Sequence, residues 1–248
     1  MTRRHIATLA AWVVMLAMTN GCSTSDPPDT SQVGSTPNTT VLPTDTAASG
    51  TIQMVAQSTG QVEVWATADE ESTSQMLSAS TEPSEVLTFL VVETLDDGWL
   101  EVQLPAPPPG GTGFVREGDV NLSRHRYQIQ ISRGAHTLTV IAGGVEAMTE
   151  PVAIGPDAPP AGTNTYIKEL LIPPDGTPYG GHVYGLAGWS STTQQFGAGA
   201  GVVAIHATAE AALGTDTLTG AIGTDAGVLG RLVDTVGLPL GTPVAITE

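Results

Sequence analysis

The sequence predicts a mainly β protein, with a small N-terminal β-barrel followed by a β-sandwich domain that carries one C-terminal helix. Beyond Gly50, short runs of β-branched and aromatic residues alternate with Gly and Pro, which is typical of strands joined by tight turns. Asp96-Asp97-Gly98, between two such runs, is a hairpin turn signal. Apolar residues recur at helical spacing in one stretch only, near the C-terminal end.

The first 22 residues are predicted to be an export signal. Residues 3–5 are basic, residues 6–18 form an apolar run too short to span a bilayer as a helix, and the only cysteine, Cys22, follows. Gly21-Cys22-Ser23 resembles a bacterial lipobox, in which the cysteine sulfur receives a lipid; the alternative is an ordinary secretory signal with an incidental cysteine. Both interpretations predict export, and the first predicts a lipid-anchored protein on the outer face of the cytoplasmic membrane, in the cell envelope.

Residues 23–50 contain Ser, Thr, Pro and Asp but few apolar residues, so they are predicted to form a disordered tether. Two domains are expected beyond it, a small barrel at residues 51–123 and a second domain at residues 124–248. Acidic residues outnumber basic ones 25 to 8 in the whole chain. Because such a surface repels phosphate backbones, nucleic acid is excluded as a partner.

The first domain is predicted to contain strands at residues 61–66, 86–92, 98–104 and 112–115. Its aromatic residues Trp65, Phe89, Trp99 and Phe114 are expected to supply the barrel core. They could instead form a binding platform, but packing is the favoured interpretation.

The second domain is predicted to contain strands at residues 127–132, 136–142, 145–148, 152–155, 163–172, 183–186, 202–206 and 242–247. The single helix is expected at residues 225–236, where apolar residues follow the helical period. Thr224 or Asp225 is able to cap its start, and Gly237 its end.

Several motifs of the second domain occur in an order known from one enzyme family. They are Tyr127-Gln128-Ile129-Gln130-Ile131-Ser132, His136-Thr137-Leu138-Thr139-Val140, Pro178-Tyr179-Gly180, Tyr184-Gly185-Leu186, Val203-Ala204-Ile205-His206-Ala207-Thr208 and Leu240-Gly241-Thr242-Pro243-Val244. This series resembles the catalytic domain of the L,D-transpeptidases, which crosslink peptidoglycan stem peptides. The first domain, with Gly98-Trp99-Leu100 and Gly113-Phe114-Val115-Arg116, is similar to the Src-homology-type barrel that precedes such domains in actinobacterial members.

The catalytic motif of that family is degenerate in this chain. Active members carry Ser-His-Gly-Cys followed by an aliphatic residue and Arg, and the cysteine thiolate attacks the donor peptide. The corresponding stretch here matches Thr219 to the motif histidine, Ala221 to the cysteine and Gly223 to the arginine. A register shifted by one residue would place Ile222 at the cysteine position instead. The resemblance implies that His206 retains a family position and that His206, Thr208 and Tyr184 line a peptide groove.

Two roles remain open for the residues that could support catalysis. A hydroxyl of Ser190, Ser191, Thr219 or Thr224 could replace the thiol with His206 as base, but these side chains also suit turns and caps. The favoured interpretation of His206 is a hydrogen-bonded residue at the end of a strand. No ligand-spaced His and Asp cluster accompanies the single cysteine, so neither a metal nor another cofactor is expected.

The sequence therefore predicts an envelope lipoprotein of L,D-transpeptidase type that acts in peptidoglycan and cell-wall organisation and binds stem peptides or envelope proteins as a pseudoenzyme. One alternative is an active transpeptidase or carboxypeptidase with a substitute nucleophile. The other is a purely structural envelope lipoprotein.

Overall fold

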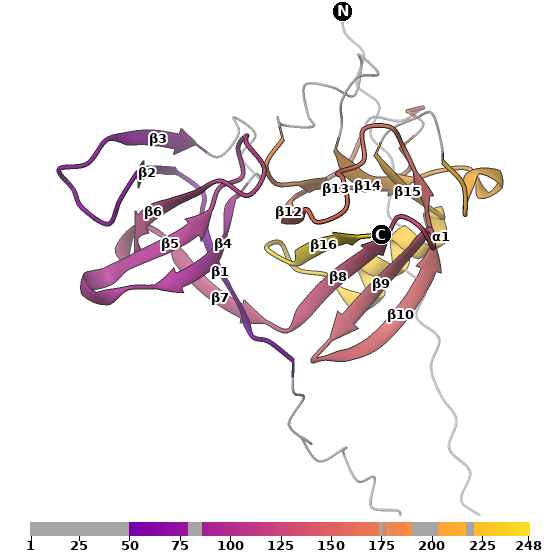
Figure 1. Ribbon diagram of the computed structural model, residues 1–248, viewed down its shortest axis with the longest axis horizontal. Coiled ribbons are helices and arrows are strands. Elements are labelled where there is room, and N and C mark those ends of the chain that lie inside the picture. Colours follow the sequence, from indigo (N-terminus) through magenta and orange to yellow (C-terminus); the bar gives the residue numbers. More distant parts are fainter. Residues whose placement is uncertain (1–49, 79–85, 174–175, 178, 190–202, 217–220) are drawn as a thin grey trace, which may run out of the picture. The chain divides into compact units, whose positions relative to one another are not determined.

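The computed structural model describes residues 50–78, 86–173, 176–177, 179–189, 203–216 and 221–248. The predicted export signal, Cys22 and most of the tether lie outside these ranges. The described residues belong to one compact unit that contains two β-sheets (Figure 1). Within the described ranges, no helix has both the length and the apolar character needed to cross a membrane.

The first sheet is barrel-like, and each of its strands runs antiparallel to its neighbours. Its strand order is β3-β2-β6-β5-β4-β1-β7. The strands are β1 (Gln53–Ser58), β2 (Gln61–Trp65), β3 (Ser74–Ser78), β4 (Leu87–Thr94), β5 (Trp99–Gln103), β6 (Thr112–Arg116) and β7 (Asn121–His125). The four predicted strands correspond to β2, β4, β5 and β6, whereas β1, β3 and β7 were not predicted.

The barrel core is aliphatic apart from one aromatic residue, Phe89. It consists of Ala56, Val62, Val64, Leu87, Phe89, Leu100, Val102 and Val115. Trp65 and Trp99 are buried as predicted, but they do not belong to this cluster. Together with the half-buried Phe114, they alternate with the cluster residues along their strands and so point to the opposite face.

The outward tryptophans are nevertheless buried, since they pack against each other. The Trp65 and Trp99 rings meet edge to face, with centroids 5.1 Å apart. The Arg116 guanidinium lies 3.8 Å from the Trp99 ring centroid, and its Nη2 lies 2.6 Å from a Glu70 carboxylate oxygen. Its Nη1 donates to the Asp97 carbonyl at 2.8 Å. The expected packing role is therefore fulfilled outside the core.

The second sheet has nine strands in the order β10-β9-β8-β16-β12-β13-β14-β15-β11. The strands are β8 (Tyr127–Ser132), β9 (Thr137–Ala142), β10 (Val145–Pro151), β11 (Ala153–Ile154), β12 (Asn164–Leu171), β13 (Val183–Leu186), β14 (Ala204–Ala207), β15 (Ile222–Thr224) and β16 (Pro243–Thr247). Most neighbours are antiparallel, but β14 with β15 and β16 with β8 are parallel. All predicted strands of this domain are present, and β15 is additional.

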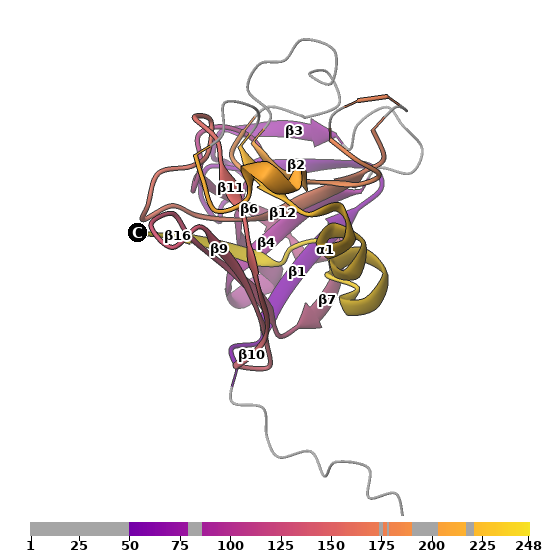
Figure 2. The ribbon, with the colours of Figure 1, turned by 90° about the vertical axis from the view of Figure 1, so that its right-hand side faces the viewer.

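The predicted helix begins as α1 (Ala226–Gly230) and continues as a π-helical turn (Arg231–Val236). The Asp225 carboxylate caps its start by accepting from the backbone N–H groups of Gly227 and Val228, and Gly237 ends it in the left-handed conformation at φ 63°. The helix lies against the second sheet (Figures 1 and 2), where its buried residues join the core.

A buried tyrosine links the two sheets of the compact unit. The Tyr166 hydroxyl, on β12, donates toward the carbonyls of Thr88 at 2.8 Å and Gln103 at 3.1 Å. In return, the Gln103 amide donates to the Asn164 carbonyl at 3.1 Å. Tyr166 is fully buried, and burial raises the pKa of its hydroxyl well above the ordinary value, so it remains a donor.

Candidate functional site

His206 lies in β14, between two neighbouring strands. Its register partners are Val183 of β13 on one side and Gly223 of β15 on the other. Paired residues project from the same face of a sheet, so these positions share one face, which we call the His206 face. Two residues further on, Thr208 falls on that face as well.

The His206 imidazole is held in one tautomer. Its Nδ1 lies 2.8 Å from the Ala207 carbonyl, which can only accept, so Nδ1 carries the proton and Nε2 is left as an acceptor. Nε2 is buried and has no hydrogen-bond partner among the described residues. The Tyr179 ring meets the imidazole edge to face at 5.1 Å. Burial lowers the pKa of His206, although the Ala207 carbonyl opposes this, and the ring is neutral at pH 7.

The position matched to the catalytic cysteine is part of the protein core. Ala221 is fully buried and belongs to the same apolar cluster as Val152 and Ile154. Its carbonyl accepts from the Gly155 backbone N–H at 2.7 Å. In the shifted register the corresponding residue would be Ile222, which pairs with Ile205 and so projects from the face opposite His206. Neither residue supplies a nucleophile.

The position matched to the motif arginine is filled by a neighbour. Gly223 is buried, and a Cβ atom added there would lie 2.7 Å from both Cβ and Cγ2 of Thr208. The two segments are also joined through the backbone, since the Thr208 N–H donates to the Thr224 carbonyl at 2.8 Å. The Thr208 side chain therefore occupies the space into which a side chain at position 223 would have to extend.

The structure brings two of the three predicted groove residues together. His206 and Thr208 share the His206 face, but Tyr184 pairs with Ile205 and projects into the core on the other side. Tyr184 is fully buried, and its hydroxyl has no partner among the described residues. Burial, together with the negative charge of Asp234, raises its pKa to about 12. Tyr184 therefore does not line a groove with His206, because the register of β13 turns it away.

Of the four hydroxyls considered as substitute nucleophiles, the structure describes that of Thr224. Ser190, Ser191 and Thr219 lie outside the described residues. Thr224 is fully buried, and its Oγ1 has no partner among the described residues. Because Thr224 follows Gly223 in β15, it projects from the face opposite His206, so that histidine is not positioned to act as its base.

Tyr179 was not singled out as a site residue, although the motif Pro178-Tyr179-Gly180 contains it. Its carbonyl accepts from the Ala207 N–H at 3.0 Å, which fastens this segment to the end of β14. Gly180 follows at φ 78°, and a Cβ there would lie 2.5 Å from the Ala207 Cβ. The signal available in the sequence was an aromatic residue followed by a glycine, the residue that most readily adopts positive φ. Among the described residues, no three His, Cys, Asp or Glu side chains gather into a potential metal site.

The sequence matches no protein-family model and no curated protein. Among solved structures, the chain is similar to an L,D-transpeptidase from Mycobacterium tuberculosis H37Rv, with 15% identity and a TM-score of 0.41 over 78% of this chain and 80% of that one. It is also similar to the L,D-transpeptidase catalytic domain from E. faecium, with 20% identity and a TM-score of 0.36 over 48% and 95% of the two chains.

A third similar structure is the L,D-transpeptidase (residues 123–326) from Xylanimonas cellulosilytica DSM 15894, with 14% identity and a TM-score of 0.37. The match covers 48% of this chain and spans 59% of the length of that one. These TM-scores describe partial superposition. The family suspected from the motifs, the L,D-transpeptidases, is also the family of these solved structures that the chain resembles.

Proposed function

We propose that this chain is an exported envelope protein, lipid-anchored through Cys22 to the outer face of the cytoplasmic membrane, that acts in peptidoglycan organisation without crosslinking stem peptides. It binds stem peptides or envelope proteins through the His206 face. The motif series and the resemblance to L,D-transpeptidases support peptidoglycan as the setting. The lipobox-like Gly21-Cys22-Ser23 supports the anchor.

The observation that carries this proposal is the burial of Ala221. The motif match assigns the cysteine position to Ala221, whose methyl group is packed into the core, and the chain has no cysteine beyond Cys22. Removing the nucleophile from a covalent mechanism leaves only the residual acceleration from binding and oxyanion stabilisation. We therefore expect no transpeptidation by a thiol mechanism.

The His206 imidazole is suited to binding instead. The neutral ring has an unpaired Nε2 acceptor, which can take a hydrogen bond from an N–H or O–H group of a ligand once the side chains that bury it move aside. Peptide backbones present such N–H groups. A bound donor would also relieve the desolvation penalty of an unpaired buried acceptor.

The first experiment tests for catalysis. The purified chain is incubated with tetrapeptide-bearing muropeptides, and the products are separated by mass spectrometry. We expect neither crosslinked dimers nor released D-Ala. A stem-peptide adduct on any residue beyond Gly50 would overturn the proposal and favour a substitute nucleophile.

The second experiment distinguishes a binding protein from a purely structural one. Sedimentation with purified sacculi is compared for the native chain, His206→Asn and His136→Asn. Asn at position 206 can still donate to the Ala207 carbonyl but lacks the Nε2 acceptor. We expect His206→Asn to weaken binding about tenfold, the effect of one lost hydrogen bond.

His136→Asn is the matched control, because His136 lies in a turn at φ 52°, which Asn tolerates, and pairs with the exposed Asp216. It is expected to bind normally. If the native chain does not sediment with sacculi, or if both variants bind as well as it does, then the His206 face does not bind stem peptides.

A further inference from the structure

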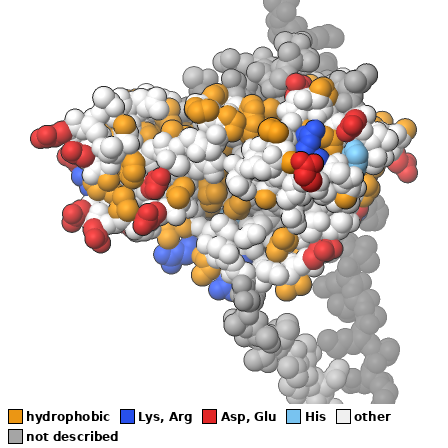
Figure 3. Space-filling view, in the orientation of Figure 1, with side chains coloured by type: hydrophobic (Ala, Val, Ile, Leu, Met, Phe, Trp, Pro, Cys, Tyr) orange, Lys and Arg blue, Asp and Glu red, His pale blue; other side chains and the backbone are white. Residues whose placement is uncertain are grey.

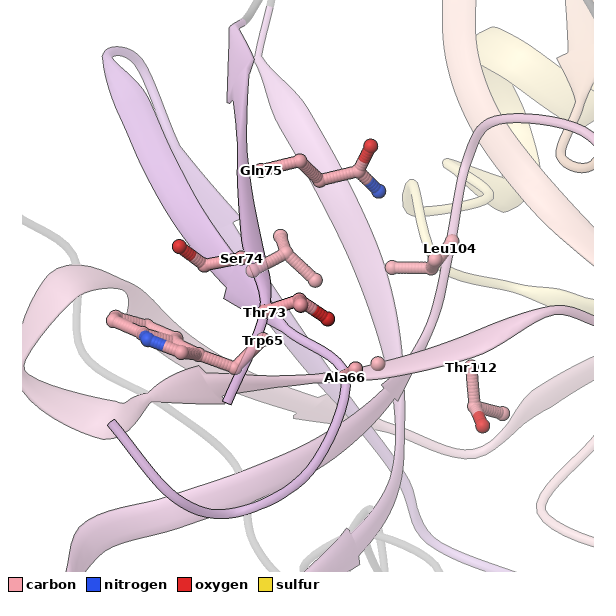
Figure 4. Close-up of a pocket in the computed structure, with 9 residues that line it drawn as sticks. Trp65, Ala66, Thr73, Ser74, Gln75, Leu104 and Thr112 are labelled. Atoms are coloured by element: carbon pink, nitrogen blue, oxygen red, sulfur yellow. The ribbon is translucent and has the colours of Figure 1, made fainter. Parts of the chain in front are cut away.

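The barrel contains a cavity that plays no part in the proposed function. It has a volume of about 300 Å³ and opens where β2 and β6 diverge. These two strands are paired at a single position, Trp65 with Phe114. Beyond that pair the start of β3 forms one wall, and Leu104 with the start of β6 forms the other (Figure 4).

The base of the cavity is apolar and depends on a glycine. Val64 and Leu104 line it together with Gly113. A Cβ added to Gly113 would lie 2.7 Å from Val64 Cγ1 and 3.3 Å from Leu104 Cδ2. The two walls can approach in this way only because position 113 has no side chain.

The polar groups of the cavity are uncharged and available. Thr73, Gln75 and Thr112 line it, and their side chains make no hydrogen bond to any other described residue. Figure 4 shows the Gln75 carboxamide extending toward the Leu104 wall, whereas Trp65 and Ser74 point away. Gln75 thus offers both a donor and an acceptor beside an apolar surface.

The absence of charge restricts what the cavity can hold. No Lys, Arg, His, Asp or Glu is among the described residues that line it, although acidic side chains are plentiful on the face shown in Figure 3. A charged ligand would be partly desolvated there without a counter-charge, and an anion would also be repelled by a chain of net charge −17. These conditions favour a neutral ligand.

We propose that this cavity binds a small uncharged molecule bearing a secondary amide. Either its N–H or its C=O group pairs with the Gln75 carboxamide, since the two point in opposite directions in a trans amide, and the adjacent methyl or methylene group rests on Val64 and Leu104. A cavity of this size lies at the lower end of the range for small-molecule sites, so the dissociation constant is expected to be about millimolar. The amide could come from an acetylated amino sugar or from a blocked amino acid.

The test is saturation-transfer NMR on the full chain with two neutral amide probes, N-acetylglucosamine and N-acetyl-D-alanine methylamide, and with the cation glucosamine for comparison. We expect saturation of the acetyl methyl group in at least one amide probe. Saturation in both indicates recognition of the amide alone, and saturation in one identifies the source. No saturation in either probe at millimolar concentration, or equal saturation of glucosamine, would overturn the assignment.

The variant Gln75→Glu tests whether the ligand binds in this cavity. It keeps the size of an exposed side chain but replaces the amide N–H donor with a negatively charged carboxylate. The matched control is Gln61→Glu, which makes the same change on β2 outside the cavity, where Gln61 pairs with Ser78. We expect Gln75→Glu to weaken binding about tenfold and Gln61→Glu to leave the affinity unchanged. Equal loss, or no loss, in the two variants would refute this location. Neither result depends on the sacculus experiment.

Discussion

Three Tyr→Phe substitutions should have different effects on stability, because the three hydroxyls differ in their partners. The Tyr166 hydroxyl is fully buried, and its single O–H is shared between two carbonyls, the nearer at 2.8 Å. The Tyr127 hydroxyl lies 3.4 Å from the Val236 carbonyl, beyond the usual length of an O–H···O bond. The Tyr184 hydroxyl is buried with no partner among the described residues.

Tyr166→Phe removes one hydrogen bond and leaves buried carbonyls short of a donor, so it should lower the free energy of unfolding by about 2 kcal/mol. For a unit of this size, that corresponds to a fall in Tm of about 4–8 °C. Tyr127→Phe should cost no more than about 0.5 kcal/mol, since the lost contact is long. Tyr184→Phe should be neutral or stabilising by up to about 1 kcal/mol, because it removes an unpaired polar group. It removes no charge, since the pKa of Tyr184 is raised to about 12.

Urea unfolding at pH 7, followed by tryptophan fluorescence, measures all three differences against the native chain. The order is the essential result, because the substitutions remove the same atom in each case. If Tyr184→Phe destabilises the chain as much as Tyr166→Phe does, the Tyr184 hydroxyl has a partner such as a buried water. The inference from unpaired hydroxyls would then be wrong.

Three further predictions concern charge and burial. Burial lowers the pKa of His206 in the folded state, so the unfolded chain binds an extra proton as pH falls through about 6.5, and stability is lost. The urea midpoint should therefore fall more between pH 7.5 and pH 5.5 for the native chain than for His206→Asn. Arg116→Ala removes the guanidinium from Trp99 together with its hydrogen bonds, and urea unfolding should show a loss of about 1–2 kcal/mol. In a Cys22→Ser background, the thiol of Ala221→Cys should react with a disulfide reagent at least about a thousandfold more slowly than in urea, since access requires opening of the core.

Each of these three predictions would be contradicted by one specific result. An equal fall in both urea midpoints would mean that His206 is already protonated or exposed in the folded chain. Arg116→Lys should recover only part of the lost stability, because lysine lacks the planar fork; full recovery would reduce the contact to simple charge. Rapid labelling of the thiol at position 221 would place that position in a solvent-accessible pocket.

The strands were predictable where burial imposes a pattern. β13 (Val183–Leu186) coincides with the prediction, because all four of its residues are buried. β3 (Ser74–Ser78) was missed because it is an exposed, mostly polar strand at the edge of its sheet. β15 (Ile222–Thr224) is too short to show a period and depends on its neighbours for hydrogen bonds. Sequence patterns indicate which residues are buried, whereas these two strands are held in place mainly by backbone hydrogen bonds to neighbouring strands.

The candidate site was predictable only as a set of positions. The motifs located His206 and Ala221 in the chain, but the burial of Ala221 depends on strands far away in the sequence. Tyr184 was assigned to the groove because it belongs to one of the motifs that carry the family resemblance. A shift of one position along a strand reverses the face, and only the register with β14 shows which face it takes. Similarly, Trp99 was assigned to the barrel core although it belongs to the outer face.

The packing of Thr208 against Gly223 bears on any attempt to redesign this end of the sheet. A side chain at position 223 would begin with a Cβ atom 2.7 Å from the Cβ and Cγ2 atoms of Thr208, so Thr208 would have to move. The Thr208 N–H also donates to the Thr224 carbonyl, which ties the two segments together. Because the effects of contacting residues do not add, a larger residue at position 223 calls for a smaller one at position 208 in the same variant. The two positions therefore have to be changed as a pair, not one at a time.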